Sequence, residues 1–249
     1  MVFKRQVVLI IQARMGSTRL PGKSMMDLAG EPLVGRILER VKQCKTLDQI
    51  VLAIPNTDMD KPLAELANRY GIEVFEGSED DLVDRYYKAA IAYNASIVVR
   101  LPADNATPEP KEIDRIVDHH LSLNRPGFSS NLSQIDGSGY PDGIGAEVFD
   151  ITLLSHVWNT VTDAQKREHV HLNFYNYETG KAVDSGWCPV STIQCPAAFC
   201  RPDLVLDVNT LEQYLFMKNL YESLYPINAQ FTILDIIDWY DNKFRDYSK

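Results

Sequence analysis

The chain has 249 residues, of which 45% are hydrophobic and 24% charged, and its formal net charge at pH 7 is −9. This length allows one well-buried core, and the composition is that of a soluble globular protein. The negative charge argues against a general nucleic-acid surface, so an anionic ligand is expected to bind through local basic residues or a metal ion.

The sequence also bears on location. No apolar run approaches the length of a membrane span, and the run Val7–Ile11 is shorter than the apolar core of a signal peptide. The four cysteines are Cys44, Cys188, Cys195 and Cys200. They form no Cys-x-x-Cys pair, which favours reduced thiols. We therefore expect a cytoplasmic protein with no membrane partner and no nucleic-acid partner.

Strand-like and helix-like segments alternate over the first half of the chain. Gln6–Ile11 is a continuous β-branched apolar run, typical of a strand covered on both faces. Leu33–Cys44 places its apolar residues on one helical face. Strands are then predicted at 49–54, 72–75 and 96–101, and helices at 60–71, 80–94 and 110–123. This alternation predicts a parallel sheet with right-handed crossovers.

The pattern changes after about residue 124. Shorter strands are predicted at 127–131 and 143–149, around a turn-rich loop, followed by helices at Thr152–Thr162 and Asp163–Tyr177. The alternation returns with a strand at Pro202–Asp207 and helices at 209–224 and 231–247. We expect one α/β domain over residues 1–249, with an inserted or appended element at about 125–190.

A basic, glycine-rich loop follows the first strand: Gln12–Ser24, QARMGSTRLPGKS. It is close to the phosphate loop G-x-x-x-x-G-K-[ST], but five residues separate Gly16 from Gly22 where that motif has four. This spacing disfavours a P-loop kinase or ATPase. The loop still carries three cations, Arg14, Arg19 and Lys23. Such cations suit phosphate oxygens, and glycines let backbone N–H groups approach an anion.

Two aspartates follow other predicted strands. The strand at 96–101 runs into Asp104, and the strand at Pro202–Asp207 ends on Asp207. Ligands of open α/β sheets bind at the carboxyl ends of the strands, so parallel neighbouring strands would bring both aspartates to the basic loop. Two carboxylates together with substrate phosphates suit Mg²⁺. The alternatives remain that the loop is a solvated turn and that Asp207 only caps the following helix.

The stretch IIQARMGSTRLPGKSMMDLAGEPLVGRILERV, residues 10–41, resembles the opening of the cytidylyltransferases that activate acidic sugars. These are the CMP-Kdo and acylneuraminate synthetases, and the chain is most similar to the branch of spore-coat polysaccharide biosynthesis proteins. The resemblance continues through FEGSEDDLVDRYYKAA, VVRLPADNATPEP, YPDGIGAEVF, REHV and LVLDVNTLEQY, and so covers most of the chain in order.

The resemblance implies a three-layer α/β/α, Rossmann-like nucleotidyltransferase fold with a mixed, mainly parallel sheet. It implies transfer of CMP from CTP to a sugar or acidic sugar, with release of pyrophosphate, in surface polysaccharide or glycoconjugate biosynthesis. It also implies that the segment at 125–190 lies on the substrate side and forms a homodimer.

The resemblance also implies roles for individual residues. Arg14, Arg19 and Lys23 are the expected catalytic residues, which hold the triphosphate and stabilise the leaving pyrophosphate. The expected nucleotide-binding residues are Ala13, Arg14, Gly16, Ser17, Arg19, Lys23 and Arg100. Asp104 and Asp207 are the expected ligands of the Mg²⁺ cofactor. Where the family has Gly-Asp-Cys-Pro, this chain has Ala103-Asp104-Asn105-Ala106, which keeps the aspartate and alters the wall beside it.

The acceptor side is predicted from fewer signals. The candidates are Arg85, Asp142, Glu147, Arg167 and His169. Arg167 or His169 would meet a carboxylate or phosphate of the acceptor. Two alternatives stay open: Arg167 and Glu168 belong to a surface helix, and Asp142 only shapes a turn with Gly143.

Two other classes of protein compete with this interpretation. A glycosyltransferase of similar fold would carry an Asp-x-Asp metal motif after a strand. Asp58–Asp60 fits that motif in letters but lies at a predicted helix start. A non-catalytic nucleotide-binding relative is the other possibility, and the combination of three loop cations with two aspartates argues against it.

Overall fold

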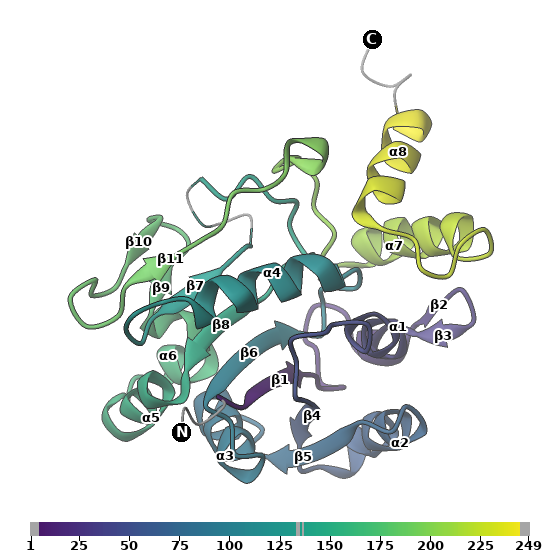
Figure 1. The fold of residues 1–249 in the computed structure, drawn as a ribbon. Helices are drawn as coiled ribbons and strands as arrows, with labels where there is room; N and C mark the ends of the chain where they lie inside the picture. Colours follow the sequence, from purple (N-terminus) through teal and green to yellow (C-terminus); the bar gives the residue numbers. More distant parts are fainter. Residues whose placement is uncertain (1–4, 133–134, 136, 245–249) are drawn as a thin grey trace.

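A twisted seven-stranded sheet lies at the centre of the computed structural model, which describes residues 5–132, 135 and 137–244 (Figure 1). Its strand order is β11-β7-β8-β6-β1-β4-β5. The strands are β1 Val7–Gln12, β4 Gln49–Pro55, β5 Glu73–Gly77, β6 Ile97–Pro102, β7 Phe128–Ser130, β8 Glu147–Asp150 and β11 Val190–Ser191. Within this sheet β8 runs antiparallel to both neighbours, β6 and β7, and the other pairings are parallel. The predicted mixed, mainly parallel sheet is confirmed.

Strand β1 shows why the fold has three layers. Val7–Ile11 are at most 2% exposed, so both faces of the strand are covered. Val7, Leu9 and Ile11 belong to one apolar cluster, whereas Val8 and Ile10 belong to another. Alternating side chains of a strand point to opposite faces, so the continuous apolar run predicted helices on both sides.

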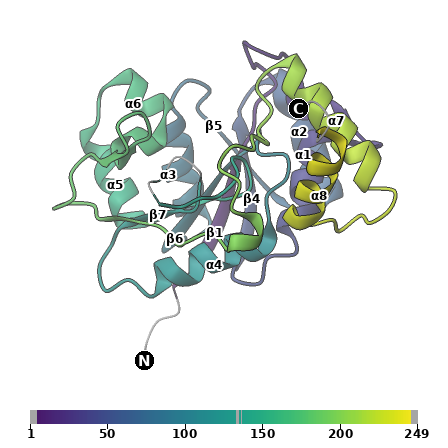
Figure 2. The same ribbon diagram turned by 90° about the horizontal axis from the view of Figure 1, so that it is seen from above.

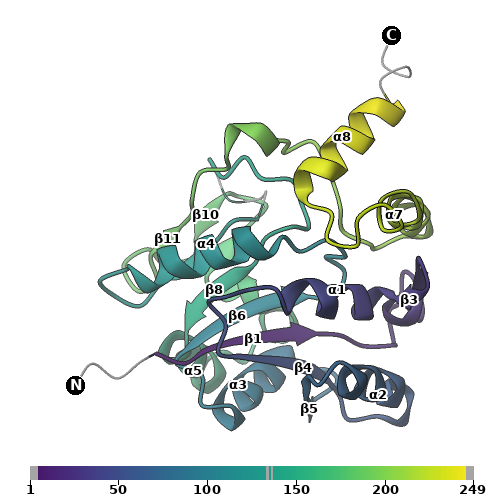
Figure 3. The same cartoon turned by 45° about the vertical axis from the view of Figure 1, so that its right-hand side comes forward.

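The helices divide between these two faces (Figures 2 and 3). The face of Leu9 is covered by α1 Leu33–Val41, α2 Lys61–Arg69 and α4 Pro110–Leu121, with α7 Leu211–Leu224 and α8 Ile233–Phe244 packed outside. The face of Ile10 is covered by α3 Leu82–Ala92 and α5 Ile151–Thr160, and the short helix α6 Ala164–Glu168 lies against α3. No described helix is long and apolar enough to cross a membrane.

Smaller elements complete the chain. Two hairpins are formed by β2 Asp27–Leu28 with β3 Glu31–Pro32, and by β9 Tyr175–Asn176 with β10 Lys181–Ala182. In the described part of the chain, 3-10 turns lie at Lys23–Met25, Asp58–Asp60, Val170–Asn173 and Ala197–Phe199.

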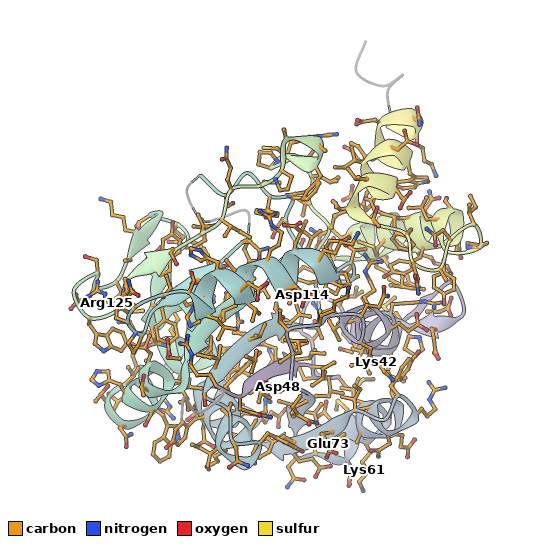
Figure 4. All side chains as sticks on the ribbon, in the orientation of Figure 1. Lys42, Asp48, Lys61, Glu73, Asp114 and Arg125 are labelled. Atoms are coloured by element: carbon orange, nitrogen blue, oxygen red, sulfur yellow. The ribbon has the colours of Figure 1, made fainter. Side chains whose placement is uncertain are left out.

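Carboxylates fix the edge of the sheet opposite the site. Asp48 accepts a hydrogen bond from Val7 N at 3.0 Å, and Asp114 of α4 accepts from Lys45 N and Thr46 N, both at 2.9 Å (Figure 4). These bonds hold the start of β1 and the loop between α1 and β4. The polar residues that precede the strands therefore stabilise the fold, and the carboxyl ends of the strands are left for ligands.

Two predicted elements differ from the structure. The strand predicted at Pro202–Asp207 is not part of the seven-stranded sheet, and it makes only single bridges, Asn105 to Asp207 and Asp142 to Val205. The helix predicted over Asp163–Tyr177 ends at Glu168 and is followed by a 3-10 turn and β9. Asn173 interrupts it because its amide donates to the Lys166 and Val170 carbonyls. The last helix ends at Phe244, and the predicted residues 245–247 lie outside the described part of the chain.

Candidate functional site

A cavity of about 480 Å³ opens at the carboxyl ends of β1 and β6, which lie side by side and point to the same edge of the sheet (Figure 3). Six of the residues predicted to bind nucleotide line it: Ala13, Arg14, Ser17, Arg19, Lys23 and Arg100. Both predicted metal ligands, Asp104 and Asp207, line the same cavity. The residues expected to bind the acceptor contribute Arg85, Asp142, Glu147 and His169.

Gly16 and Arg167 are not among the residues that line the cavity. Gly16 is exposed, and a Cβ placed there would have no atom within 4 Å. Arg167 pairs with Asp81 at 2.6 Å and donates to the Trp158 and Val161 carbonyls. These contacts tie α6 to the start of α3 and the end of α5.

The basic loop is held by internal hydrogen bonds. Gly22 adopts φ +70°, a left-handed conformation that favours glycine, and its N–H donates to the Met15 carbonyl at 3.1 Å. Met15 N–H in turn donates to buried Asp60 at 2.7 Å. Asp60 therefore stabilises the loop, and neither Asp58 nor Asp60 lines the cavity as an Asp-x-Asp metal motif would require.

Lys23 connects this loop to the segment that carries Asp207. Its Nζ donates to the Val208 carbonyl at 2.7 Å and to the Asn209 side chain at 3.3 Å, and lies 3.4 Å from an Asp104 carboxylate oxygen. Arg19 also donates to Asn209, at 2.8 Å. Two cations from the loop therefore lie beside the predicted metal ligands.

Asp104, Asp142 and Asp207 lie close enough together to repel one another, and Lys23 lies next to Asp104. Val208 N donates to the Asp104 carbonyl at 2.9 Å, and Leu206 N donates to the Asp142 carbonyl at 3.1 Å, so backbone bonds bring the three segments together. Burial, followed by the Asp142 and Asp104 carboxylates, raises the pKa of Asp207 to about 6. A divalent cation would relieve this repulsion, so the donor set fits Mg²⁺. The fit depends on substrate phosphates as further ligands, because among the described residues no group of three acidic, cysteine or histidine side chains is arranged to hold a metal ion.

A buried ion pair forms the inner wall of the cavity. Arg100 of β6 lies directly across from Glu147 of β8, and their side chains are 2.7 Å apart. Arg100 also donates to the Gln12 side chain at 3.2 Å, and Tyr177 donates to Glu147 at 2.7 Å. Burial lowers the pKa of Arg100, but the Glu147 carboxylate raises it, with a net rise. Arg100 is therefore a fixed cation whose charge is neutralised by Glu147.

His171 and Tyr177 line the cavity although they were not predicted to bind a ligand. Their rings lie 4.8 Å apart, and His171 lies 6.0 Å from His169. Burial lowers the pKa of His171 to about 4, and its Nδ1 is buried without a hydrogen-bond partner in the described structure. The path of the chain after α6 brings these rings inward, and a predicted continuous helix gave no signal of it.

Two more guanidinium groups line the cavity nearer the loop. Arg14 is 3.9 Å from Glu168 of α6. Arg85 donates to the Ser78 carbonyl at 2.9 Å, burial lowers its pKa, and its Nε is buried without a partner in the described structure. Arg14 and Glu79 are among the charges that act on it. Tyr86, whose ring lies 5.9 Å from the Arg100 guanidinium, also acts on it, so Arg85 lies between the loop and Arg100 and has no ion pair with a described residue.

Loop cations facing paired aspartates, at the carboxyl ends of a mainly parallel sheet, define a nucleotidyltransferase with a Rossmann-like fold. The sequence profile of the cytidylyltransferase family matches residues 8–184. The chain belongs to the cytidylyltransferase family, whose members transfer CMP.

Relatives and solved structures agree with this assignment. The chain is 31% identical over 221 residues to the spore coat polysaccharide biosynthesis protein SpsF of Bacillus subtilis, covering 87% of this chain and 86% of that protein. It is 35% identical over 229 residues to the 3-deoxy-manno-octulosonate cytidylyltransferase of Chlorobium chlorochromatii, covering 86% and 85%. The structure of a cytidylyltransferase from Leptospira borgpetersenii superimposes with a TM-score of 0.85 at 29% identity, covering 96% of this chain and 95% of the other.

Proposed function

We propose that the protein transfers CMP from CTP to a hydroxyl group of a sugar or sugar acid, with release of pyrophosphate, in surface polysaccharide or glycoconjugate biosynthesis. The observation that carries this proposal is the meeting of Lys23 and Arg19 with Asp104 and Asp207 in one cavity. The relative that acts on 3-deoxy-manno-octulosonate supports a sugar acid among the candidate acceptors.

The chemistry requires positioning and charge neutralisation more than covalent catalysis. An acceptor oxygen attacks the α-phosphorus of CTP in line with the bond to the leaving pyrophosphate. Lys23 and Arg19 stabilise the negative charge that collects on the leaving group, and Arg14 holds the phosphates from the side of α6. Ala13 and Ser17 line the cavity next to these cations and bind the nucleotide.

Asp104 and Asp207 would hold Mg²⁺. When bound, the ion supplies positive charge to the phosphate oxygens. Mg²⁺ bound to proteins usually keeps several water ligands and is held by one or two carboxylates together with substrate phosphates, which Asp104 and Asp207 would supply here.

A quaternary arrangement belongs to the same proposal. We propose a homodimer formed through residues 125–190, and a monomeric mass by analytical ultracentrifugation would contradict it.

A glycosyltransferase is disfavoured because Asp60 holds the basic loop and Asp58 pairs with Lys61 at the surface.

Pyrophosphate release tests the reaction. We expect the purified protein to release pyrophosphate from CTP in the presence of Mg²⁺ and a suitable acceptor, and far less from UTP, GTP or ATP. Chelation of the metal should abolish release. Binding of CTP without turnover of any acceptor in a broad panel of sugars and sugar acids would instead favour a non-catalytic relative.

A further inference from the structure

Two cysteines, Cys195 and Cys200, meet outside the nucleotide cavity, on either side of the 3-10 turn Ala197–Phe199. Their thiols share a hydrogen bond. Both residues pack against Gly139, where an added Cβ would lie 2.8 Å from Cys200 Sγ and 3.5 Å from Cys195 Cβ. A disulfide joins its sulfurs at about 2.05 Å, so thiols already in hydrogen-bond contact need only a short approach to form one.

The two thiols differ in their access to solvent. All four cysteines lie in the described part of the chain, and of these only Cys200 is exposed. Cys195 is 5% exposed, and burial, followed by the neighbouring Cys200 thiol, raises the pKa of Cys195 to about 12. An oxidant in solution therefore meets Cys200 first, while Cys195 stays a protonated thiol beside it. An exposed cysteine in contact with a second thiol is typical of a redox-sensitive pair.

The pair lies on the segment that leads to Asp207. Cys195 N donates to the Ser138 carbonyl at 2.9 Å. Further along the segment, the Leu204 carbonyl accepts from Asp142 N, also at 2.9 Å. These bonds hold the segment against the loop that carries Asp142, one before the 3-10 turn and one after it. A covalent bond across the turn shortens this part of the segment, so the two hydrogen bonds cannot both keep their geometry.

We propose that Cys195 and Cys200 are an oxidation site, at which a peroxide converts the two thiols into a disulfide that disturbs the hold on Asp142 and Asp207. With hydrogen peroxide, the Cys200 sulfur attacks one oxygen, the O–O bond breaks, and water leaves a sulfenic acid on Cys200. The Cys195 sulfur then attacks the Cys200 sulfur, the S–O bond breaks, and a second water leaves with the Cys195 proton. The two sulfurs lose two electrons, and these reduce the peroxide to the two waters.

Mass spectrometry of the reduced full-length protein, treated with hydrogen peroxide, tests the site. We expect a loss of about 2 Da, the mass of two hydrogen atoms, which dithiothreitol restores. Cys200→Ser should abolish this loss, and Cys195→Ser should leave a sulfenic acid on Cys200 that dimedone traps. Cys44→Ser and Cys188→Ala are the controls, and both should keep the loss. Absence of the disulfide from the oxidised wild type, or its persistence in Cys200→Ser, would overturn the proposal.

Gly139→Ala tests the geometry of the pair. Its methyl group would displace the Cys200 sulfur, so we expect disulfide formation to slow about tenfold. Gly137→Ala is the matched control, because Gly137 also has a left-handed φ, +77° against +71°, but a Cβ there would have no atom within 4 Å. Equal rates in the two variants would contradict a meeting of the thiols against Gly139.

The effect on the cavity rests on the proposed function and has its own measurement. Mg²⁺ demands near-ideal ligand geometry, so we expect the Kd for α,β-methylene-CTP with Mg²⁺ to rise about threefold or more in the oxidised protein. Calorimetry measures this Kd, reduction should restore it, and peroxide should not change it in Cys200→Ser. An unchanged Kd in the oxidised wild type would overturn the link to the aspartates. A protein that forms the disulfide but binds no CTP analogue in either state would refute the proposed function and leave the oxidation site standing.

Discussion

Lys23 links two parts of the site that are far apart in sequence. Its Nζ contacts the Val208 carbonyl, the Asn209 side chain and the Asp104 carboxylate, and its side chain is 12% exposed. A lysine is a flexible point charge that can exchange protein oxygens for phosphate oxygens. These oxygens hold Lys23 beside Asp104, where the proposed reaction would place the leaving pyrophosphate.

Lys23→Ala should lower kcat by about 10²–10³, which is typical of losing one preorganised electrostatic donor. Steady-state pyrophosphate release measures this effect. Lys61→Ala is the matched control, because Lys61 is also a lysine but lies at the surface with 67% of its side chain exposed (Figure 4). A Lys23→Ala variant with wild-type kcat would remove Lys23 from the catalytic residues.

That the cations of the basic loop line the cavity was predictable because they follow one another in the sequence. Arg14, Arg19 and Lys23 share a short segment after a recognisable strand, so local spacing sufficed. His171 and Tyr177 could not be found in this way. Their approach to Glu147 depends on the break after Glu168 and on a turn closed by Asn173, and no local pattern indicates that path.

At the scale of elements, the strand predicted at Pro202–Asp207 was wrong, yet Asp104 and Asp207 lie close together as expected. The apolar residues of this segment are buried as predicted, with Leu204 2% and Leu206 0% exposed. The segment nevertheless makes only single bridges, to Asn105 and Asp142. Asp104 and Asp207 therefore meet through these bridges and the bond from Val208 N to the Asp104 carbonyl, and not as the ends of neighbouring sheet strands.

Gly143 fixes the distance between the Asp142 loop and this segment. Its φ is +89°, and an added Cβ would lie 2.9 Å from the Leu206 carbonyl carbon and 3.0 Å from Asp207 N. Gly143→Ala should therefore shift Asp207 and raise the Mg²⁺ concentration needed for half-maximal activity several-fold. A left-handed alanine alone costs about 1–2 kcal/mol, and we expect this variant to lower the free energy of unfolding by more than that. Mg²⁺ titration of the activity and thermal unfolding measure the two effects.

Gly71→Ala provides the comparison. Gly71 also has a left-handed φ, +65°, but a Cβ there would have no atom within 4 Å. This control should lose stability through backbone strain and keep the wild-type dependence on Mg²⁺. Equal effects of the two variants on that dependence would show that contact with Leu206 and Asp207 does not position the aspartate.

At the scale of the whole molecule, the carboxylates of the cavity lower the free energy of unfolding. Burial, followed by the neighbouring carboxylates of Asp142 and Asp104, raises the pKa of Asp207 to about 6. An unfolded chain restores the ordinary value of about 3.9. Between about pH 4 and pH 6 the folded protein binds a proton that the unfolded chain has released, so rising pH destabilises the folded state through this range. Above about pH 6 the full penalty is present.

Asp207→Asn should therefore stabilise the protein in the absence of metal and nucleotide at pH 7.5. Allowing for solvent screening, the gain is about 1–2 kcal/mol, or roughly 2–8 °C in Tm. The difference should vanish near pH 4, where the wild-type aspartate is protonated and resembles asparagine. Asp58→Asn is the control, since Asp58 is 92% exposed and should show no such pH dependence.

Mg²⁺ and CTP should reverse this order. At about 100 times its Kd a ligand stabilises the folded state by about 2.7 kcal/mol, which exceeds the expected gain of the variant. The wild type should then melt above Asp207→Asn, which lacks one metal carboxylate, while the variant gains little from the pair of ligands. Thermal unfolding with neither ligand, with each alone and with both measures the reversal. Two results would contradict this account: a lower Tm of Asp207→Asn than of the wild type without ligands, or the same rise in Tm for both proteins on adding Mg²⁺ and CTP. Either would show that metal binding does not act by relieving carboxylate repulsion at Asp207.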